Sequence, residues 1–161
     1  MNPSVAYNGS KFRKRYFDAV ELYRNSDYEG ALVIFREIIA AADRQDVYRH
    51  KYRSYEGLIR VCLGETHAVE LCRGVADEGL KDVEVQYNLA LAEYKLNNRR
   101  RAMLAVQRGL SIDARNPELR RLRILMGSRR RPVIRLLNRD HAINKWLGKL
   151  TYRKPGTPGR P

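Results

Sequence analysis

The residues best suited to chemistry are few in this chain and lie far apart. Cys62 and Cys72 occur in apolar segments, without a second pair, a CxxC spacing or a histidine at ligand spacing. We therefore expect both to be reduced core thiols. The three histidines, His50, His67 and His141, fall in different segments and do not suggest a metal site. The sequence also has no glycine-rich phosphate loop, nucleophile elbow or HExxH motif, so we expect no catalytic residue, no cofactor and no enzyme activity.

Arginines near the C-terminal end form a second set of residues that could bind a partner. Residues 98 to 161 contain fifteen Arg and three Lys against three acidic residues, whereas residues 1 to 97 carry fourteen basic and fifteen acidic side chains. The net charge of +14 therefore arises entirely in the C-terminal part. On adjacent helices these arginines would form a surface for acidic proteins or phosphates, and a solvated face without a partner is the alternative. The predicted basic surface consists of Arg99, Arg100, Arg101, Arg120, Arg121, Arg123, Arg129, Arg130 and Arg131.

Helices must position these side chains, because helical periodicity dominates the chain and no alternating strand pattern of useful length competes with it. Apolar residues recur three or four positions apart in seven segments, as they do on the buried stripe of a helix. Asp27 is a good helix cap, and Gly64 is suited to a left-handed helix end. The predicted helices cover residues 12–25, 28–42, 46–63, 65–79, 83–96, 98–112 and 118–126.

Short turns join these helices into hairpins, and the hairpins repeat. A small residue early in each second helix marks the repeat, with spacings of 37 and then 34 residues. Repeated units must place equivalent residues at equivalent distances. Four positions after each marker comes a residue able to fill the seam, the interface between the two helices of a hairpin. Twelve positions before the first and third markers comes another alanine. The second repeat has Gly57 instead, displaced by one position. The markers are Ala31, Ala68 and Ala102, the seam residues are Phe35, Cys72 and Val106, and the first-helix alanines are Ala19 and Ala90.

Two stretches carry a family resemblance. The first is Asp27-Tyr28-Glu29-Gly30-Ala31-Leu32 followed by Phe35, and the second is Tyr87-Asn88-Leu89-Ala90 followed by Tyr94, Asn97, Ala102 and the exit from Asp113 to Pro117. Both resemble the tetratricopeptide repeat (TPR) family over about residues 12 to 126. The chain departs from the family at Arg15 and Gln86, where a tryptophan-like residue is usual, and at Ala114, where proline is common. The resemblance implies an all-α fold, a short right-handed α-α superhelix of about three TPR-like hairpins with a C-terminal capping segment.

In the TPR family the first helices of the hairpins line a concave groove, and the predicted first helices here are rich in tyrosine. Tyrosine combines a large rigid ring with a polar tip and is enriched in binding patches. The alternative is that most of these rings pack between helices. The resemblance implies a partner-binding groove lined by Tyr52, Tyr55, Glu84, Tyr87, Asn88, Leu91 and Lys95.

The C-terminal part begins as a fourth repeat and then departs from the pattern. A 34-residue step places a new first helix at Pro117, after Asn116, but the run of arginines from residue 129 is followed by Pro132. Residues 133 to 150 mix Trp146, leucines and basic residues, which suits either a cap on the last repeat or a helix lying on an anionic membrane. We predict a flexible N-terminus (1–11), a TPR-like helical repeat domain (12–126), basic C-terminal capping helices (127–150) and a disordered tail (151–161).

Two functions are consistent with this organisation. The first is a protein-protein interaction scaffold or adaptor that binds a peptide or helix in its concave groove, with a basic C-terminal surface favouring acidic partners. The second is an RNA-, ribosome- or anionic-membrane-associated protein that acts through its arginine surface. No run of about eighteen apolar residues, as a membrane-spanning helix needs, occurs, and we expect a cytoplasmic protein.

Overall fold

The computed structural model describes residues 12–78 and 81–127, and within these ranges the chain forms α-helices, one 3-10 turn and no strand. The predicted all-α class is therefore confirmed. The predictions for the flexible N-terminus, the capping helices and the tail lie outside the described residues, apart from residue 127. The elements are α1 (Arg13–Arg24), α2 (Tyr28–Ala41), α3 (Arg49–Cys62), the 3-10 turn η1 (Thr66–Ala68), α4 (Val69–Asp77), α5 (Val83–Lys95), α6 (Arg99–Ile112) and α7 (Pro117–Leu125).

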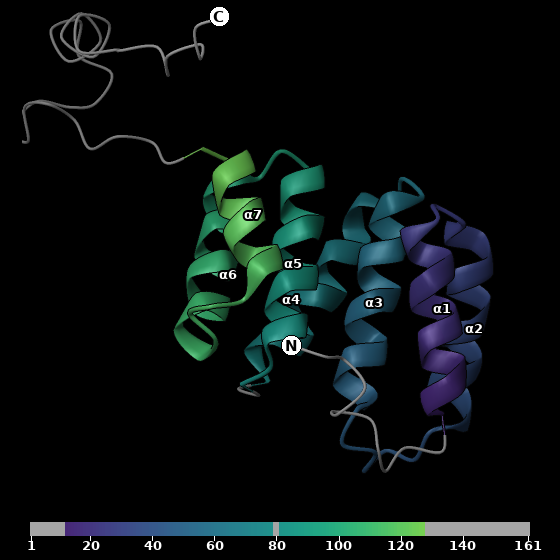
Figure 1. Cartoon of the computed structure of the whole chain (residues 1–161). Coiled ribbons are helices and arrows are strands. Elements are labelled where there is room, and N and C mark those ends of the chain that lie inside the picture. The colour runs from purple at the N-terminus through teal and green to yellow at the C-terminus, as the bar shows by residue number, and fades with distance from the viewer. Residues whose placement is uncertain (1–11, 79–80, 128–161) are drawn as a thin grey trace, which may run out of the picture. The chain divides into compact units, whose positions relative to one another are not determined.

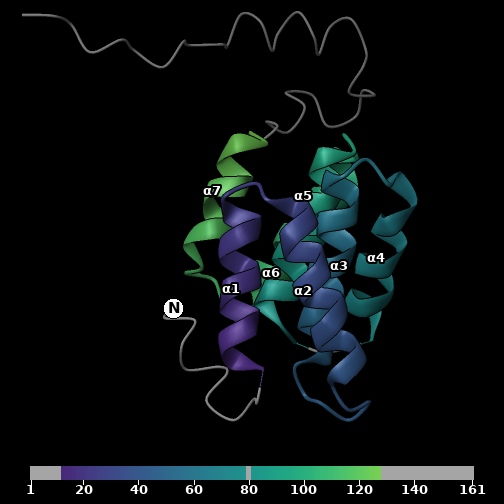
Figure 2. The same cartoon turned by 90° about the vertical axis from the view of Figure 1, so that its right-hand side faces the viewer.

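Each helix packs against the next one in the chain, and α5 also packs against α3 and α7. Figure 1 shows this progression from the hairpin of α1 and α2 at one end to α6 and α7 at the other. In Figure 2, turned by 90°, α1 and α7 lie on the same side of the array and α4 lies on the opposite side. Consecutive hairpins are thus laid one after another, as the repeat spacing predicts.

The helix ends follow from local sequence. Asp27 caps α2 by accepting the Gly30 amide at 2.9 Å, and Asn116 caps α7 by accepting the Leu119 amide at 3.0 Å. The turn inside each hairpin contains one residue with positive φ: Ser26 (65°), Gly64 (96°) and Asn97 (59°). The sequence predicts this left-handed geometry only at Gly64, because glycine adopts it without strain.

Two predicted helix starts differ in the structure, and a side chain in the preceding loop explains the first of them. The third predicted helix begins at residue 49 rather than 46, because the Asp46 carboxylate binds the Tyr48 amide at 2.8 Å and holds a turn there. Arg49 also donates to the carbonyls of Ile39 and Ala42, both at 2.8 Å, and ties the start of α3 to the end of α2. The fourth predicted helix is split into η1 and the nine-residue α4.

The predicted seam between the paired helices is confirmed. Gly57 shows how close the approach is: a Cβ placed there would lie 2.7 Å from Cys72 Sγ and 3.1 Å from the Ala68 carbonyl oxygen. At the equivalent positions of the other hairpins an alanine is small enough to let the two helices approach closely. The marker, seam and first-helix residues Ala31, Ala68, Ala102, Phe35, Cys72, Val106, Ala19 and Ala90 are all buried.

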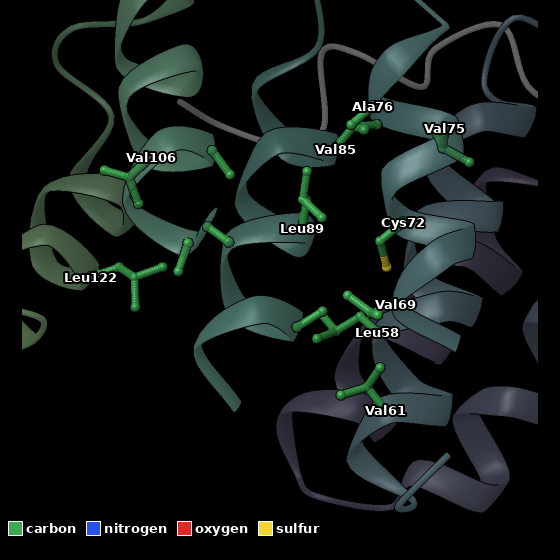
Figure 3. Packing of buried hydrophobic residues seen from close by; sticks show 14 of the residues in the cluster. Leu58, Val61, Val69, Cys72, Val75, Ala76, Val85, Leu89, Val106 and Leu122 are labelled. Carbon is green, nitrogen blue, oxygen red and sulfur yellow. The ribbon is translucent and has the colours of Figure 1, made fainter. Parts of the chain in front are cut away.

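The core has two chemically different halves. Around α1, α2 and α3 it is aromatic, with Phe12, Tyr16, Phe35, Tyr52 and Tyr55 buried together. From α3 to α7 it is aliphatic, as Figure 3 shows for valines and leucines that point inward from several helices. No helix in the described part of the chain is both long and apolar enough to cross a membrane.

Candidate functional site

The carboxylate of Glu84 connects the first helices of three hairpins. Glu84 lies in the first turn of α5, and its Oε1 accepts hydrogen bonds from the hydroxyls of Tyr16 on α1 and Tyr55 on α3, the latter at 3.0 Å. Its Oε2 accepts a hydrogen bond from Lys51 Nζ, also on α3, at 3.1 Å. One acidic side chain therefore ties α1, α3 and α5 together.

Asp82 extends this polar cluster by one residue before α5. It caps the helix by accepting the Glu84 amide at 2.9 Å, and its Oδ2 lies 3.0 Å from His50 Nε2 and 3.2 Å from Lys51 Nζ. Burial works to raise the pKa of the Asp82 carboxyl, but the hydrogen bond from His50 and the charge of Lys51 outweigh it and lower that pKa to about 2. Asp82 is therefore ionised at neutral pH.

Lys51 is the cation shared by the two carboxylates. It is buried, and burial works to lower the pKa of its ammonium, but the charges of Glu84 and Asp82 outweigh burial and raise that pKa. Since these charged groups are satisfied by one another, we interpret the Glu84 cluster (Tyr16, His50, Lys51, Tyr55, Asp82 and Glu84) as a floor that fixes the first helices.

Aromatic rings surround this floor. The Phe35 and Tyr55 rings stack with centroids 5.0 Å apart, and the Tyr16 ring lies 5.9 Å from the rings of both Tyr52 and Tyr55. Burial and the nearby Glu84 carboxylate raise the pKa of Tyr55 well above its ordinary value. The Tyr55 phenol therefore stays protonated and acts as a hydrogen-bond donor.

Three of the predicted groove residues are inside the protein, and for them the prediction is wrong. Tyr52 and Asn88 are fully buried, and Tyr55 is 5% exposed. Asn88 faces α3, where its Nδ2 donates to Ser54 Oγ at 2.9 Å, and its Oδ1 has no partner among the described residues. Packing of α3 against α5 therefore buries this side of both helices.

The other predicted groove residues reach the surface. Tyr87 and Leu91 are half-buried and Lys95 is exposed, at successive turns of α5, whereas Glu84 is half-buried and bound within the floor. Tyr23 of α1 and Tyr28 of α2, both half-buried, join them. The Lys95 ammonium lies 5.7 Å from the centre of the Tyr28 ring. We call Tyr23, Tyr28, Tyr87, Leu91 and Lys95 the tyrosine face.

Side-chain interactions show that the tyrosine face is continuous across several helices. The Tyr23 ring lies 5.9 Å from Tyr28 and 5.8 Å from Tyr55. Burial, followed by the neighbouring Cys62 and Tyr87, raises the pKa of Tyr23. Burial and a hydrogen bond with Glu118 of α7 raise the pKa of Tyr87.

Both cysteines are free, as predicted, but they differ in environment. Cys72 is fully buried, and burial raises the pKa of its thiol to about 12. Cys62 is half-buried beside the tyrosine face, close enough to Lys95 and Tyr28 for both to act on its pKa. Burial outweighs the Lys95 charge and raises the pKa of Cys62, so neither thiol is an activated nucleophile. In the described ranges no group of three His, Cys, Asp or Glu side chains could hold a metal ion.

The predicted basic surface is only partly free. Arg99 is half-buried and donates to the Gly127 carbonyl at 3.2 Å, which ties α6 to the end of α7. Arg121 lies 3.9 Å from Glu118. Arg129, Arg130 and Arg131 lie outside the described residues. Within residues 98 to 127, the exposed arginines that form no ion pair with any residue described are Arg100, Arg101, Arg115, Arg120 and Arg123, which we call the unpaired arginines.

The arginines of the middle hairpin behave differently. Arg53 pairs with Glu78 at 2.7 Å, Arg60 with Glu65 at 2.8 Å, and Arg73 with the buried Glu93 at 2.7 Å. By contrast, residues 98 to 127 contain eight arginines and only two acidic residues. The last hairpin and α7 therefore have too few carboxylates for their arginines.

A comparison of the chain with protein-family models, with curated proteins and with solved structures found no match. The interpretation of the site therefore depends on its own geometry. That geometry combines a hydrogen-bonded floor, a half-exposed tyrosine face above three helices, and unpaired arginines on α6, α7 and the loop between them.

Proposed function

We propose that the protein is a TPR-type interaction scaffold, working in the cytoplasm, which binds a peptide or helix of a partner protein on its tyrosine face. In this proposal the hairpins form a short right-handed superhelix with the first helices on its inner side. The observation that carries the proposal is the meeting of half-exposed Tyr23, Tyr28 and Tyr87, from three different helices, in one continuous patch. Tyrosines in such patches supply large contact areas and polar tips at little entropic cost.

The Glu84 cluster supports this function by making the tyrosine face rigid. The Tyr55 ring contacts the Tyr23 ring, while the Tyr55 hydroxyl is held by Glu84. A surface that is already ordered before the partner arrives loses less conformational entropy on binding. The Glu84 cluster therefore contributes to binding without touching the partner.

Charge favours an acidic partner. Lys95 is exposed within the face, and Arg24 and Arg121 are close enough to Tyr87 to act on its pKa. The unpaired arginines add positive potential at the α6–α7 end. Such potentials raise the association rate of partners with complementary charge.

The proposal is tested by affinity capture from native lysate with the full chain and with Tyr87→Ala/Leu91→Ala. The face variant is expected to lose partners that the wild type retains at about 0.5 M salt, because truncating an aromatic hot spot costs about 2 kcal/mol of binding. Val47→Ala serves as a control, since Val47 is 71% exposed and lies in the loop before α3. Unchanged partners in the face variant, with its helicity intact, would contradict the proposal.

The unpaired arginines favour a second candidate, binding to RNA or another phosphate-bearing surface. Contacts to phosphates release counterions, so their affinity falls steeply with salt. A fluorescent single-stranded RNA would then bind at low salt and dissociate well below about 0.5 M. Arg100→Gln/Arg101→Gln/Arg120→Gln/Arg123→Gln should abolish this binding while leaving capture by the tyrosine face at about 0.5 M salt unchanged.

A further inference from the structure

The outer surface of α2 carries a row of three exposed side chains, in which a valine lies between two glutamates. Glu29, Val33 and Glu37 follow one another at intervals of four residues, so they lie along one side of the helix. All three are exposed; Val33 is 57% exposed and the Glu37 side chain 53%. An exposed valine between two carboxylates has no evident role in the fold of a single molecule.

A row with the opposite charge lies at the equivalent place on α6. Arg100, Leu104 and Arg108 have the same spacing, and each is 71 residues after its counterpart, the same separation as between the marker alanines of the two hairpins. All three are exposed, with Leu104 at 48% and the Arg108 side chain at 59%. The two rows therefore occupy the same position of the repeat with inverted charge.

The charges of both rows are available for new partners. Glu29 and Arg100 make no ion pair within the described part of the molecule. Glu37 pairs with Arg15, and Arg108 lies 3.4 Å from Asp77. Both of these pairs join exposed side chains, and exposed ion pairs are weak and easily exchanged.

The two rows cannot meet within one molecule. α2 belongs to the hairpin at one end of the helical array and α6 to the hairpin at the other, with α3, α4 and α5 between them (Figure 1). The charge pattern also reads the same in both directions, so a parallel or an antiparallel pairing joins Val33 to Leu104 with each glutamate beside an arginine. A second copy of this chain is the partner whose charges match.

We propose that the α6 row of one copy docks on the α2 row of another, so that the chain associates head to tail. This contact uses different surfaces on the two copies and leaves one row free at each end, so growth past the dimer follows. The contact is small, so association is weak. None of these residues belongs to the tyrosine face, and the α2 row also lies outside the unpaired arginines, so the α2 variant separates self-association from partner capture.

Sedimentation velocity of the full chain over a concentration series tests the proposal. At about 0.15 M salt, distant like charges are screened while contacting charges still attract each other. The average mass of the wild type is expected to rise continuously with concentration. Glu29→Arg/Glu37→Arg and Arg100→Glu/Arg108→Glu should each stay monomeric, with association weakened about tenfold or more. An equimolar mixture of the two variants should associate again, since each then finds the opposite charge on the other.

The control variant Asp18→Arg/Glu21→Arg changes the net charge as much as the α2 variant but alters exposed residues of α1 outside both rows. It is expected to associate like the wild type. A wild type that stays monomeric throughout would overturn the proposal. So would a mixture of the two folded row variants that fails to associate.

Discussion

At the scale of single residues, Glu84 carries more of the structure than its position at a helix start suggests. Its carboxylate accepts hydrogen bonds from two phenol hydroxyls and one ammonium on two other helices. Nothing in the local sequence predicts these bonds, because Tyr16 and Tyr55 are 68 and 29 residues away. The sequence predicts Glu84 as a groove residue that contacts a partner, whereas in the structure its carboxylate joins α1, α3 and α5.

Replacing this carboxylate by an amide tests that role. Glu84→Gln keeps the shape but removes the charge that balances Lys51 and strengthens the bonds from the tyrosines. Because hydrogen bonds to charged groups contribute more than neutral ones, we expect the free energy of unfolding to fall by about 2 kcal/mol. Urea unfolding followed by circular dichroism measures the change. A loss no larger than that of the exposed Glu21→Gln would show that Glu84 is not a support.

For the tyrosines, the sequence predicts their position on the helices but not their exposure. That tyrosines gather on one side of the first helices follows from their spacing. Which of them stay accessible does not, because adjacent turns of α3 differ only in how closely α1 and α5 approach them. Tyr52 is therefore buried, and Tyr28 is missed because it lies at the start of a second helix.

At the scale of helices and hairpins, the sequence predicts more. The periodicity predicts the existence of every described helix, and the 37- and 34-residue spacings predict the buried small residues of the seam. Apolar periodicity and small-residue spacing are local or nearly local patterns, so they can be recognised without knowledge of the tertiary structure. Helix starts are less well predicted where a side chain such as Asp46 organises the preceding turn.

The two helical glycines of the second hairpin form a matched pair for testing the seam. Gly57→Ala places a Cβ against Cys72 and a backbone carbonyl that cannot move aside, so we expect a loss of about 1–3 kcal/mol in the free energy of unfolding. Gly74→Ala finds open space in a helix and should stabilise by up to about 1 kcal/mol. Equal effects of the two substitutions in urea unfolding would refute the close approach of α3 and α4.

The cap of α5 predicts a pH dependence. The folded pKa of Asp82 is about 2 against an ordinary value of 3.8, so its stabilising contribution is complete above about pH 4 and is lost as the pH falls towards 2. This contribution is worth about 2 kcal/mol. We expect Asp82→Asn to be less stable than the wild type at pH 6 and nearly equal to it at pH 2. A difference that persists unchanged at pH 2 in urea unfolding would contradict this assignment.

At the scale of the whole molecule, the helices differ in how much positive charge they carry and in whether their arginines form ion pairs. The sequence alone locates the positive charge in the last two fifths of the chain. The structure adds that arginines of the middle hairpin are satisfied by glutamates, whereas Arg100, Arg101, Arg120 and Arg123 are not. This difference depends on which acidic side chains the fold brings close, and composition cannot supply it.

The same scale gives the molecule separate surfaces for separate contacts. The tyrosine face gathers residues of α1, α2 and α5, and the two charged rows lie on α2 and α6. We therefore expect partner binding and self-association to respond to different substitutions.

The most direct test of the central claim, partner binding on the tyrosine face, is hydrogen–deuterium exchange of the full chain alone and with a captured partner. Binding on this face is expected to slow exchange in the second half of α1, at the start of α2 and in α5, with little change in the exposed turns of α6. Protection confined to α6 and α7, with α1 and α5 unchanged, would contradict it.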